Sequence, residues 1–324
     1  MSLDADAIVD RRRMRRKVTF WRIATVACAL AVTAIVAVVL APRGAILDGG
    51  GHIARIKIQG LIRGNQDRVE ALERLGRSSA LAVIVHIDTP GGTTAGSEQL
   101  FDALRRLQAL KPTVAVIDGL AASGGYITAM ATEHIVALDT SLVGSIGVLF
   151  QYPNFTNALK TLGIKVEEIK SSPLKAAPSG FEPTSSEARA AIAAIVMDSY
   201  TWFKGLVQER RKLDDAQLAR VSDGRIFTGR QGLALKLVDA LGNERTALAW
   251  LEREKKIPAN TPVHDFSLQP RFSDFSFMHL AAWTFEIAGL SDFARRLEGW
   301  GAVRAVERLN LDGLLALWHP SSPN

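Results

Sequence analysis

Apolar and polar residues alternate along the middle of the chain in a way that predicts strands and helices in turn. The runs IARIKIQGLI, LAVIVHID and TVAVID predict three strands, and the second, residues 81–88, is typical of a strand buried on both faces of a parallel sheet. Between them, a polar stretch at 66–77 and leucines at helical spacing in 95–110 predict two helices. The order of these elements predicts an α/β domain.

Shorter elements are predicted after residue 130. HIVAL, SIGVLF and KVEEIK are strand candidates, NFTNALKTLG predicts a helix, and residues 184–211 predict a long one. Residues 263–324 are rich in aromatic side chains and contain amphipathic stretches. We expect this last segment to pack on the domain or on a neighbouring subunit, with contact to a membrane surface as the alternative.

An uncharged stretch near the N-terminus predicts a transmembrane helix. Residues 23–41 carry no charge, and their length as a helix matches about 30 Å of hydrocarbon. Residues 1–22 hold seven Lys or Arg against three Asp, which predicts that this end stays in the cytoplasm. We therefore expect a single-pass protein of the inner membrane whose later residues are periplasmic. A cleaved signal peptide is the alternative.

Composition and charge add little to this picture. With 324 residues, the chain has room for a linker at 42–53, one domain at 54–262 and the segment 263–324. The pI of 9.6 comes mostly from the basic flank of the predicted anchor, so it does not indicate nucleic-acid binding. The single cysteine, Cys28, lies inside the predicted anchor and excludes an intramolecular disulfide.

The stretch LAASGGYITAMATE predicts a strand end, a tight turn and a helix start, with Ser123 at the turn. Ser123 is either a nucleophile or a plain helix cap. The first N–H groups of a helix have no partner within it, so the Gly124 amide is suited to hold an oxyanion. A second turn, DTPGG, offers Gly91 or Gly92 as the other donor, and Gly92 is preferred. Both turns follow neighbouring strands, at the edge where open α/β sheets bind ligands.

A nucleophilic serine needs a base, and no pattern places a histidine near Ser123. His86 and His134 fall within or beside apolar strands, where a structural histidine is the better interpretation. A lysine serves only when neutral, which requires lowering an ordinary pKa of about 10.4 by roughly three units. Lys175 lies in PLKAAP with no acidic residue nearby in the sequence, so it is the candidate base; an ordinary loop lysine is the alternative.

Three blocks of the sequence resemble the signal peptide peptidase A (protease IV) family of membrane-anchored Ser/Lys peptidases. They are HIDTPGGTTAGSEQL, DGLAASGGYITAMATEHIVALDTSLVGSIGV and GRIFTGRQGLALKLVDALG. The resemblance implies a Clp-protease-like or crotonase-like fold, with Ser123 as nucleophile and Lys175 as base. Ala176 stands where many relatives carry an acidic residue, which leaves Lys170 as a weaker alternative.

The resemblance also predicts the assembly and the activity. Short-form members form a ring, expected to be octameric, in which serine and lysine come from neighbouring chains, and they need no metal or organic cofactor. The expected function is a serine endopeptidase that cleaves signal peptides left in the membrane. The alternatives are a protease of folded membrane proteins, a crotonase-like acyl-CoA enzyme and a non-catalytic membrane scaffold.

Overall fold

The computed structural model describes residues 17, 20–21, 51–268 and 315–317. The chain divides into two compact units, 1–50 and 51–324, and the described sheets lie in the second. The predicted transmembrane helix at 23–41 and most of the aromatic-rich segment lie outside the described residues. The second unit carries every predicted site residue.

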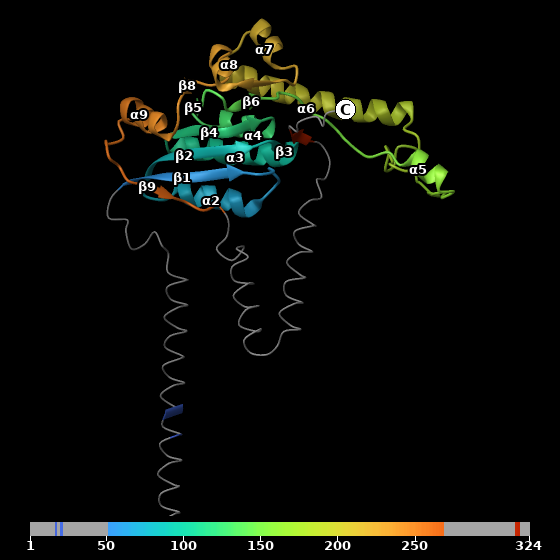
Figure 1. Cartoon of the computed structure of the whole chain (residues 1–324), viewed down its shortest axis with the longest axis horizontal. Coiled ribbons are helices and arrows are strands. Elements are labelled where there is room, and N and C mark those ends of the chain that lie inside the picture. The colour runs from blue at the N-terminus through green and yellow to red at the C-terminus, as the bar shows by residue number, and fades with distance from the viewer. Residues whose placement is uncertain (1–16, 18–19, 22–50, 269–314, 318–324) are drawn as a thin grey trace, which may run out of the picture. The chain divides into compact units, whose positions relative to one another are not determined.

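An eight-stranded sheet forms the centre of this unit (Figure 1). Its strands follow the order β7-β6-β4-β2-β1-β9, and β5 pairs with β4 and β8. All pairs are parallel except β6 with β7, which confirms the predicted α/β class. The strands are β1 (His52–Gln59), β2 (Ala80–Thr89), β4 (Thr113–Ala122), β5 (His134–Ala137), β6 (Leu142–Gly144), β7 (Ile226–Thr228), β8 (Ala240–Leu241) and β9 (Val263–Asp265). A separate two-stranded sheet joins β3 (Gly91–Thr93) to β10 (Leu315–Leu317).

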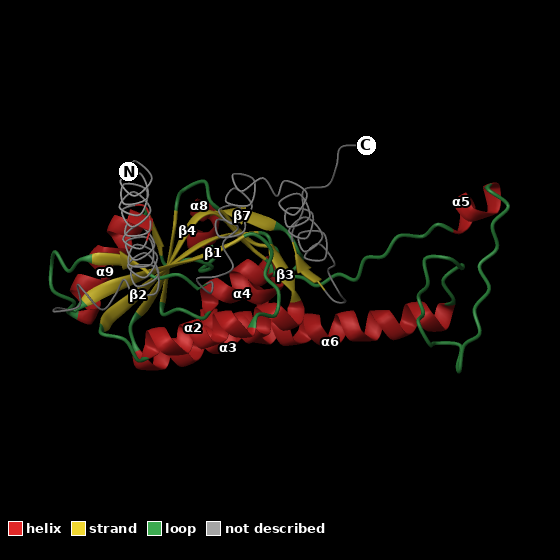
Figure 2. Cartoon of the chain, turned by 90° about the horizontal axis from the view of Figure 1, so that it is seen from below, coloured by secondary structure: helices red, strands yellow, loops and turns green. Residues whose placement is uncertain are grey.

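Helices cover both faces of the sheet, and Figure 2 shows α2, α3 and α6 along one of them. The helices are α2 (Gln66–Gly76), α3 (Thr94–Leu110), α4 (Gly124–Met130), α5 (Thr156–Thr161), α6 (Ser186–Arg211), α7 (Asp215–Val221), α8 (Gly229–Ala234) and α9 (Glu244–Lys255). The helices predicted at 66–77, 95–110 and 184–211 are confirmed within one or two residues at each end. Caps explain their starts: the side chains of Asn65, Thr93 and Ser185 accept N–H bonds at α2, α3 and α6.

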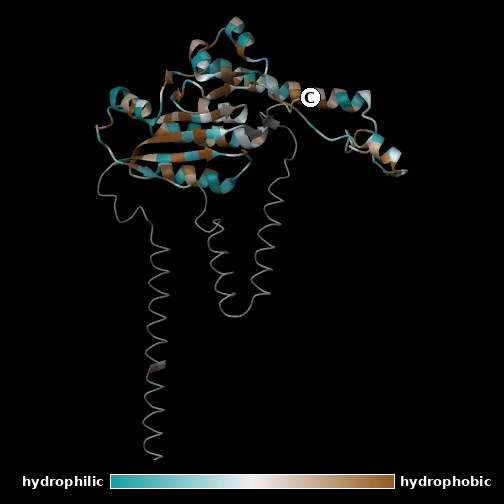
Figure 3. Cartoon of the chain, viewed as in Figure 1, coloured by the Kyte–Doolittle hydropathy of each residue, from teal (hydrophilic) through white to brown (hydrophobic). Residues whose placement is uncertain are grey.

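Strand β2 is buried on both faces, as its continuous apolar run predicts. Alternate residues of a strand point to opposite sides of the sheet. Val83, Val85 and Ile87 belong to the larger core, which includes residues of α2, α3 and α4, whereas Ala82 and Ile84 belong to a smaller core with α9. Figure 3 shows the apolar residues concentrated in these strands.

Two predicted strands are wrong. SIGVLF does not form a strand, because β6 ends at Gly144, and Gly144 and Ser145 have positive φ values of 97° and 52° that turn the chain out of the sheet. KVEEIK, at 165–170, forms no strand either. Its residues are mostly exposed, and in the described part of the chain it has no neighbouring strand with which to pair.

Residues 149–185, here called the arm, extend beyond the sheet in both views (Figures 1 and 2). Helix α6 leads from the arm back to the domain, where Phe203 and Val207 are fully buried. Among the described helices, only α6 is long and apolar enough to cross a membrane. The C-terminal half of α6 packs into the core of the domain, and Lys204 lies there over the ring of Tyr200. These contacts are typical of a helix that belongs to the domain.

Candidate active site

Two glycine-containing turns lie side by side at the carboxyl ends of β2 and β4. The two strands pair in parallel, and their last pair in register is Thr89 with Ala121. A β-carbon built on Gly125, near the start of α4, would lie 2.8 Å from the carbonyl oxygen of Thr89, so only glycine permits this approach. The turn that follows β2, with Gly91 and Gly92, is thus held against the start of α4, as the sequence predicts.

Ser123 joins β4 to α4 in a strained backbone conformation. Its φ of 53° and ψ of −115° are values that residues other than glycine rarely adopt. Such a conformation costs about 1–3 kcal/mol and persists only where the surroundings enforce it. One enforcing contact is the hydrogen bond from the Ser123 N–H to the Gly144 carbonyl oxygen, at 2.8 Å.

The Ser123 hydroxyl does not cap α4. In a plain N-cap, the side-chain oxygen accepts an N–H two or three residues further on, and Ser123 makes no such bond. Its Oγ instead lies 3.4 Å from the carbonyl oxygen of Gly147, to which it donates a long, weak hydrogen bond. The simplest structural explanation of this serine, that its hydroxyl caps the start of α4, is therefore excluded.

Two backbone N–H groups beside Ser123 take no part in the hydrogen bonds of α4 or of the bridge to Ile62. Within α4, the first N–H to be used is that of Tyr126, which donates to the Ser123 carbonyl at 2.9 Å, so Gly124 lies outside the pattern of the helix. At β3, Ile62 bonds to the carbonyl of Gly91 and the N–H of Thr93, at 2.8 and 2.9 Å. The N–H of Gly92, between them, therefore faces away from Ile62.

Lys175 lies in the arm, and the chain does not bring it to Ser123. Its backbone N–H donates to Ser172, which closes a turn, and its side chain is exposed. No hydrogen bond or ion pair of the Lys175 side chain occurs within the described residues, and no acidic group holds it there. The arm extends away from α4 in both views (Figures 1 and 2). Within one chain, the predicted dyad is therefore not assembled.

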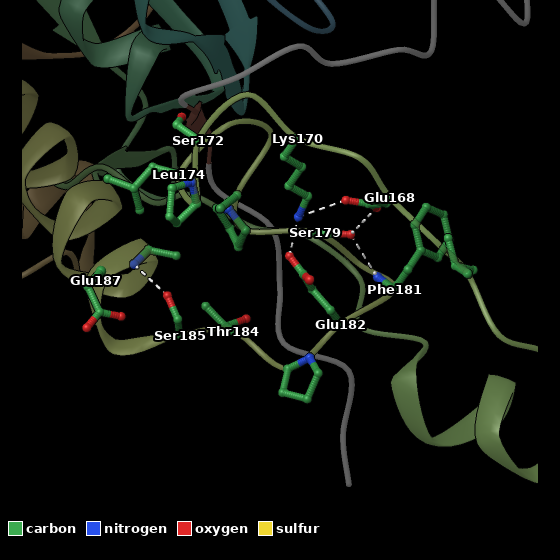
Figure 4. A pocket seen from close by; sticks show the side chains of 16 residues that line it. Glu168, Lys170, Ser172, Leu174, Ser179, Phe181, Glu182, Thr184, Ser185 and Glu187 are labelled. Carbon is green, nitrogen blue, oxygen red and sulfur yellow. Dashed lines mark hydrogen bonds and ion pairs between the residues drawn. The ribbon is translucent and has the colours of Figure 1, made fainter.

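Lys170, the alternative base, is held by two carboxylates. Its Nζ lies 2.7 Å from Glu168 and 2.5 Å from Glu182, in a groove of about 800 Å³ in the arm (Figure 4). The hydrogen bond that it donates to Glu168, followed by the one to Glu182, raises the pKa of Lys170. A lysine stabilised as a cation is a poor base, so the structure disfavours Lys170.

The two histidines nearest the strands have structural contacts, as predicted. The ring nitrogens of His86 lie 2.8 Å from an oxygen of Asp118 and 2.6 Å from one of Glu244. His134 stacks on Trp250 with 4.6 Å between ring centroids and 7° between planes. Carboxylates thus satisfy both ring nitrogens of His86, and the stack holds the ring of His134.

Thr89 is a positioning residue that sequence reasoning missed. Its hydroxyl donates to the Gly60 carbonyl at 2.5 Å and accepts the Gly91 N–H at 3.1 Å, so it fixes the turn before Gly92. The threonine in DTPGG was the available signal, because threonine hydroxyls bond to nearby backbone in turns. Across the described residues, no group of three His, Cys, Asp or Glu side chains is placed to hold a metal ion.

Comparison with known proteins places the chain in a family. Peptidase family S49 matches residues 105–258. A Synechocystis protein named as a putative protease is 36% identical over 200 residues, which are 61% of this chain and 72% of that protein. The chain belongs to peptidase family S49. The resemblance of its sequence blocks to the signal peptide peptidase A family is thereby confirmed.

Two further relatives match over smaller shares of their own length. Protease 4 of Haemophilus influenzae is 28% identical over 67% of this chain but 37% of its own length, and an Enterococcus faecium protein named as a putative signal peptide peptidase SppA is 29% identical over 61% and 58%. Among solved structures, a mutant of ClpP1 from Listeria monocytogenes superposes with a TM-score of 0.43 and 14% identity, over 60% of this chain and 94% of that one. This similarity is too low to support a conclusion, so the Clp-like or crotonase-like fold stays a prediction.

Proposed function

We propose that this S49 peptidase is a membrane-anchored serine endopeptidase that cleaves signal peptides left in the membrane. Ser123 is the nucleophile, Lys175 is the general base, and the N–H groups of Gly92 and Gly124 hold the oxyanion. The observation that carries the proposal is the strained, uncapped Ser123 at the start of α4, beside the glycine turn after β2. Strain of this kind gathers at functional sites.

The chemistry follows ordinary acyl transfer. The neutral base takes the proton from Ser123 Oγ while the oxygen attacks the peptide carbonyl, and the negative charge that develops falls on the carbonyl oxygen between the two amides. The protonated lysine then gives its proton to the leaving amine. Water, deprotonated by the same lysine, releases the acyl group and restores Ser123. Each amide donor is worth about 10²–10³-fold in rate.

The base is supplied by a neighbouring chain. Because the arm extends away from α4, its lysine meets Ser123 only where a second copy docks against it. Such docking also removes the lysine from water, which is the physical route to a neutral amine. The absence of a carboxylate next to Lys175 among the described residues, in contrast to Lys170, supports this choice.

The arm carries exposed apolar side chains that support such docking. Seven large ones lie along its length, and two more follow on α6: Phe155, Leu162, Ile164, Val166, Ile169, Leu174, Phe181, Ile195 and Met197. A soluble monomer rarely keeps so many together on its surface. The sequence supports the rest of the proposal: the uncharged stretch 23–41 as the anchor, its basic flank as the cytoplasmic side, and periplasmic placement of the peptidase domain.

A fluorophosphonate probe, which labels activated serines, tests this assignment. We expect label on Ser123 in the full chain, loss of label and of apolar-peptide cleavage in Lys175→Gln, and retention of both in the matched variant Lys170→Gln. A folded oligomer without label on Ser123 would favour the scaffold alternative. If both lysine variants lose label and cleavage equally, Lys175 is not the specific base.

A further inference from the structure

Strand β10, near the end of the chain, pairs with β3 at the position of Gly92. The pairing is antiparallel, with Ala316 opposite Gly92 and Leu317 opposite Gly91. Figure 1 shows β10 beside β3, although β10 comes from the opposite end of the sequence. A segment of the chain itself thus lies along the glycine turn.

The backbone of β3 explains which groups β10 meets. On one side of β3, the Ile62 N–H donates to the Gly91 carbonyl, and the Ile62 carbonyl accepts the N–H of Thr93. Because backbone groups alternate in direction along a strand, the N–H and carbonyl of Gly92 face the other side, where β10 lies. The amide that we assign to the oxyanion therefore faces the paired strand.

An extended peptide commonly binds by adding a strand to an exposed sheet edge. A β-carbon on Gly92 would lie 1.8 Å from the Ile62 carbonyl oxygen, so this strand needs glycine there. The edge of β3 that faces away from Ile62 is the one that pairs with β10. The sequence around β10, LLALW, is apolar and uncharged. In composition it is like the apolar peptides expected as substrates.

We infer that Leu315–Leu317 is an internal competitor of the peptide substrate, bound on the β3 edge with Ala316 at the oxyanion amide. This inference rests on the proposed function, because it assigns the substrate strand of that site. Because a peptide binds only where the edge is free, its apparent affinity is its intrinsic affinity multiplied by the fraction of free edges. Release of β10 then becomes a step before cleavage.

Ala316→Pro tests the inference, because proline removes the N–H opposite Gly92 and disfavours strand pairing. Ser321→Pro, beyond β10, is the matched control. In a Ser123→Ala background, which prevents cleavage, we expect Ala316→Pro to speed hydrogen exchange at Gly92 and to tighten binding of an apolar peptide. An edge that is nine-tenths occupied predicts about tenfold tighter binding. In the active chain, KM should fall by the same factor with kcat unchanged.

The outcomes separate this inference from a purely structural role of β10 and from the proposed function. If Ala316→Pro lowers the unfolding temperature while Gly92 exchange and peptide affinity stay unchanged, β10 only covers a sheet edge and the inference is overturned. Tighter binding in Ser123→Ala, together with no peptide cleavage by the full chain, would keep the competing strand and reject the proposed chemistry. Unchanged exchange and affinity in both proline variants would also overturn the inference.

Discussion

Gly125 lies directly against Thr89, and this contact ties the start of α4 to the end of β2. A β-carbon on Gly125 would be 2.8 Å from both the carbonyl oxygen and the Cγ2 of Thr89. The two turns that carry Ser123 and Gly92 are held in register by this close approach. The candidate site is therefore sensitive to a single methyl group at a residue that takes no part in the chemistry.

Gly125→Ala should lower kcat/KM by about tenfold or more, because displacing reacting groups by about 1 Å costs up to about 10²-fold. Gly205→Ala on α6 is the matched control, since nothing lies within 4 Å of its added β-carbon. That control should retain activity and gain about 0.5–1 kcal/mol in unfolding free energy from helix propensity. Peptide hydrolysis and urea unfolding measure the two effects. Equal activity in both variants would contradict the contact's importance.

The strain at Ser123 predicts a difference between two inactive variants. Ser123→Gly relieves the unfavourable φ and ψ, whereas Ser123→Ala keeps the β-carbon and the strain. Both should lose cleavage. Glycine should nevertheless be more stable than alanine by about 1 kcal/mol, the lower end of what such a conformation costs. Denaturant unfolding of the two proteins measures this difference; alanine as the more stable variant would show that the turn is unstrained.

His134 makes folding stability depend on pH. Burial lowers its pKa, and the charge of Asp239 opposes this only in part. A lowered pKa means that the folded state holds the neutral ring, so the contribution is complete above the ordinary value of about 6.5 and is lost as pH falls through the folded value. His134→Phe keeps the stack on Trp250 and should flatten the decline in unfolding temperature between about pH 7 and about pH 5. If the decline in unfolding temperature is unchanged in His134→Phe, groups other than His134 cause it.

The arm should be needed for assembly. Ile169 is fully exposed in the single chain, and Leu110, at the end of α3, is 67% exposed on the domain. Ile169→Asp should shift the protein to smaller species in analytical ultracentrifugation and lower peptide cleavage in parallel, because a charge placed in an apolar interface is costly. Leu110→Asp should change neither. Cleavage that persists in a monomeric Ile169→Asp protein would contradict the need for a second chain.

Much of the fold could be predicted from local pattern. β2 and α3 were predictable because their apolar residues follow the periods of a buried strand and of an amphipathic helix. The strand predicted at SIGVLF failed, since the positive φ of Ser145 depends on its hydrogen bond to Arg225, far along the chain. The same limit hides β10, whose pairing with β3 joins distant segments.

The candidate site was predictable as two glycine turns but not as a complete geometry. Sequence alone left open whether Ser123 caps a helix, and the missing cap bond decides that question. It also left Lys170 as an alternative base, which its two carboxylate partners now disfavour. The place of Lys175 depends on contacts between chains, which no local pattern encodes.

Mixing two inactive variants tests whether each site draws Ser123 and Lys175 from two different chains. Ser123→Ala retains Lys175, and Lys175→Ala retains Ser123, so a site shared between chains is rebuilt only where the two variants meet. After co-expression with two different affinity tags and purification through both, about a quarter of the shared sites in an evenly mixed ring should hold both residues. We expect peptide cleavage at about a quarter of the wild-type rate. Mixed oligomers without cleavage, while each variant is folded, would contradict it.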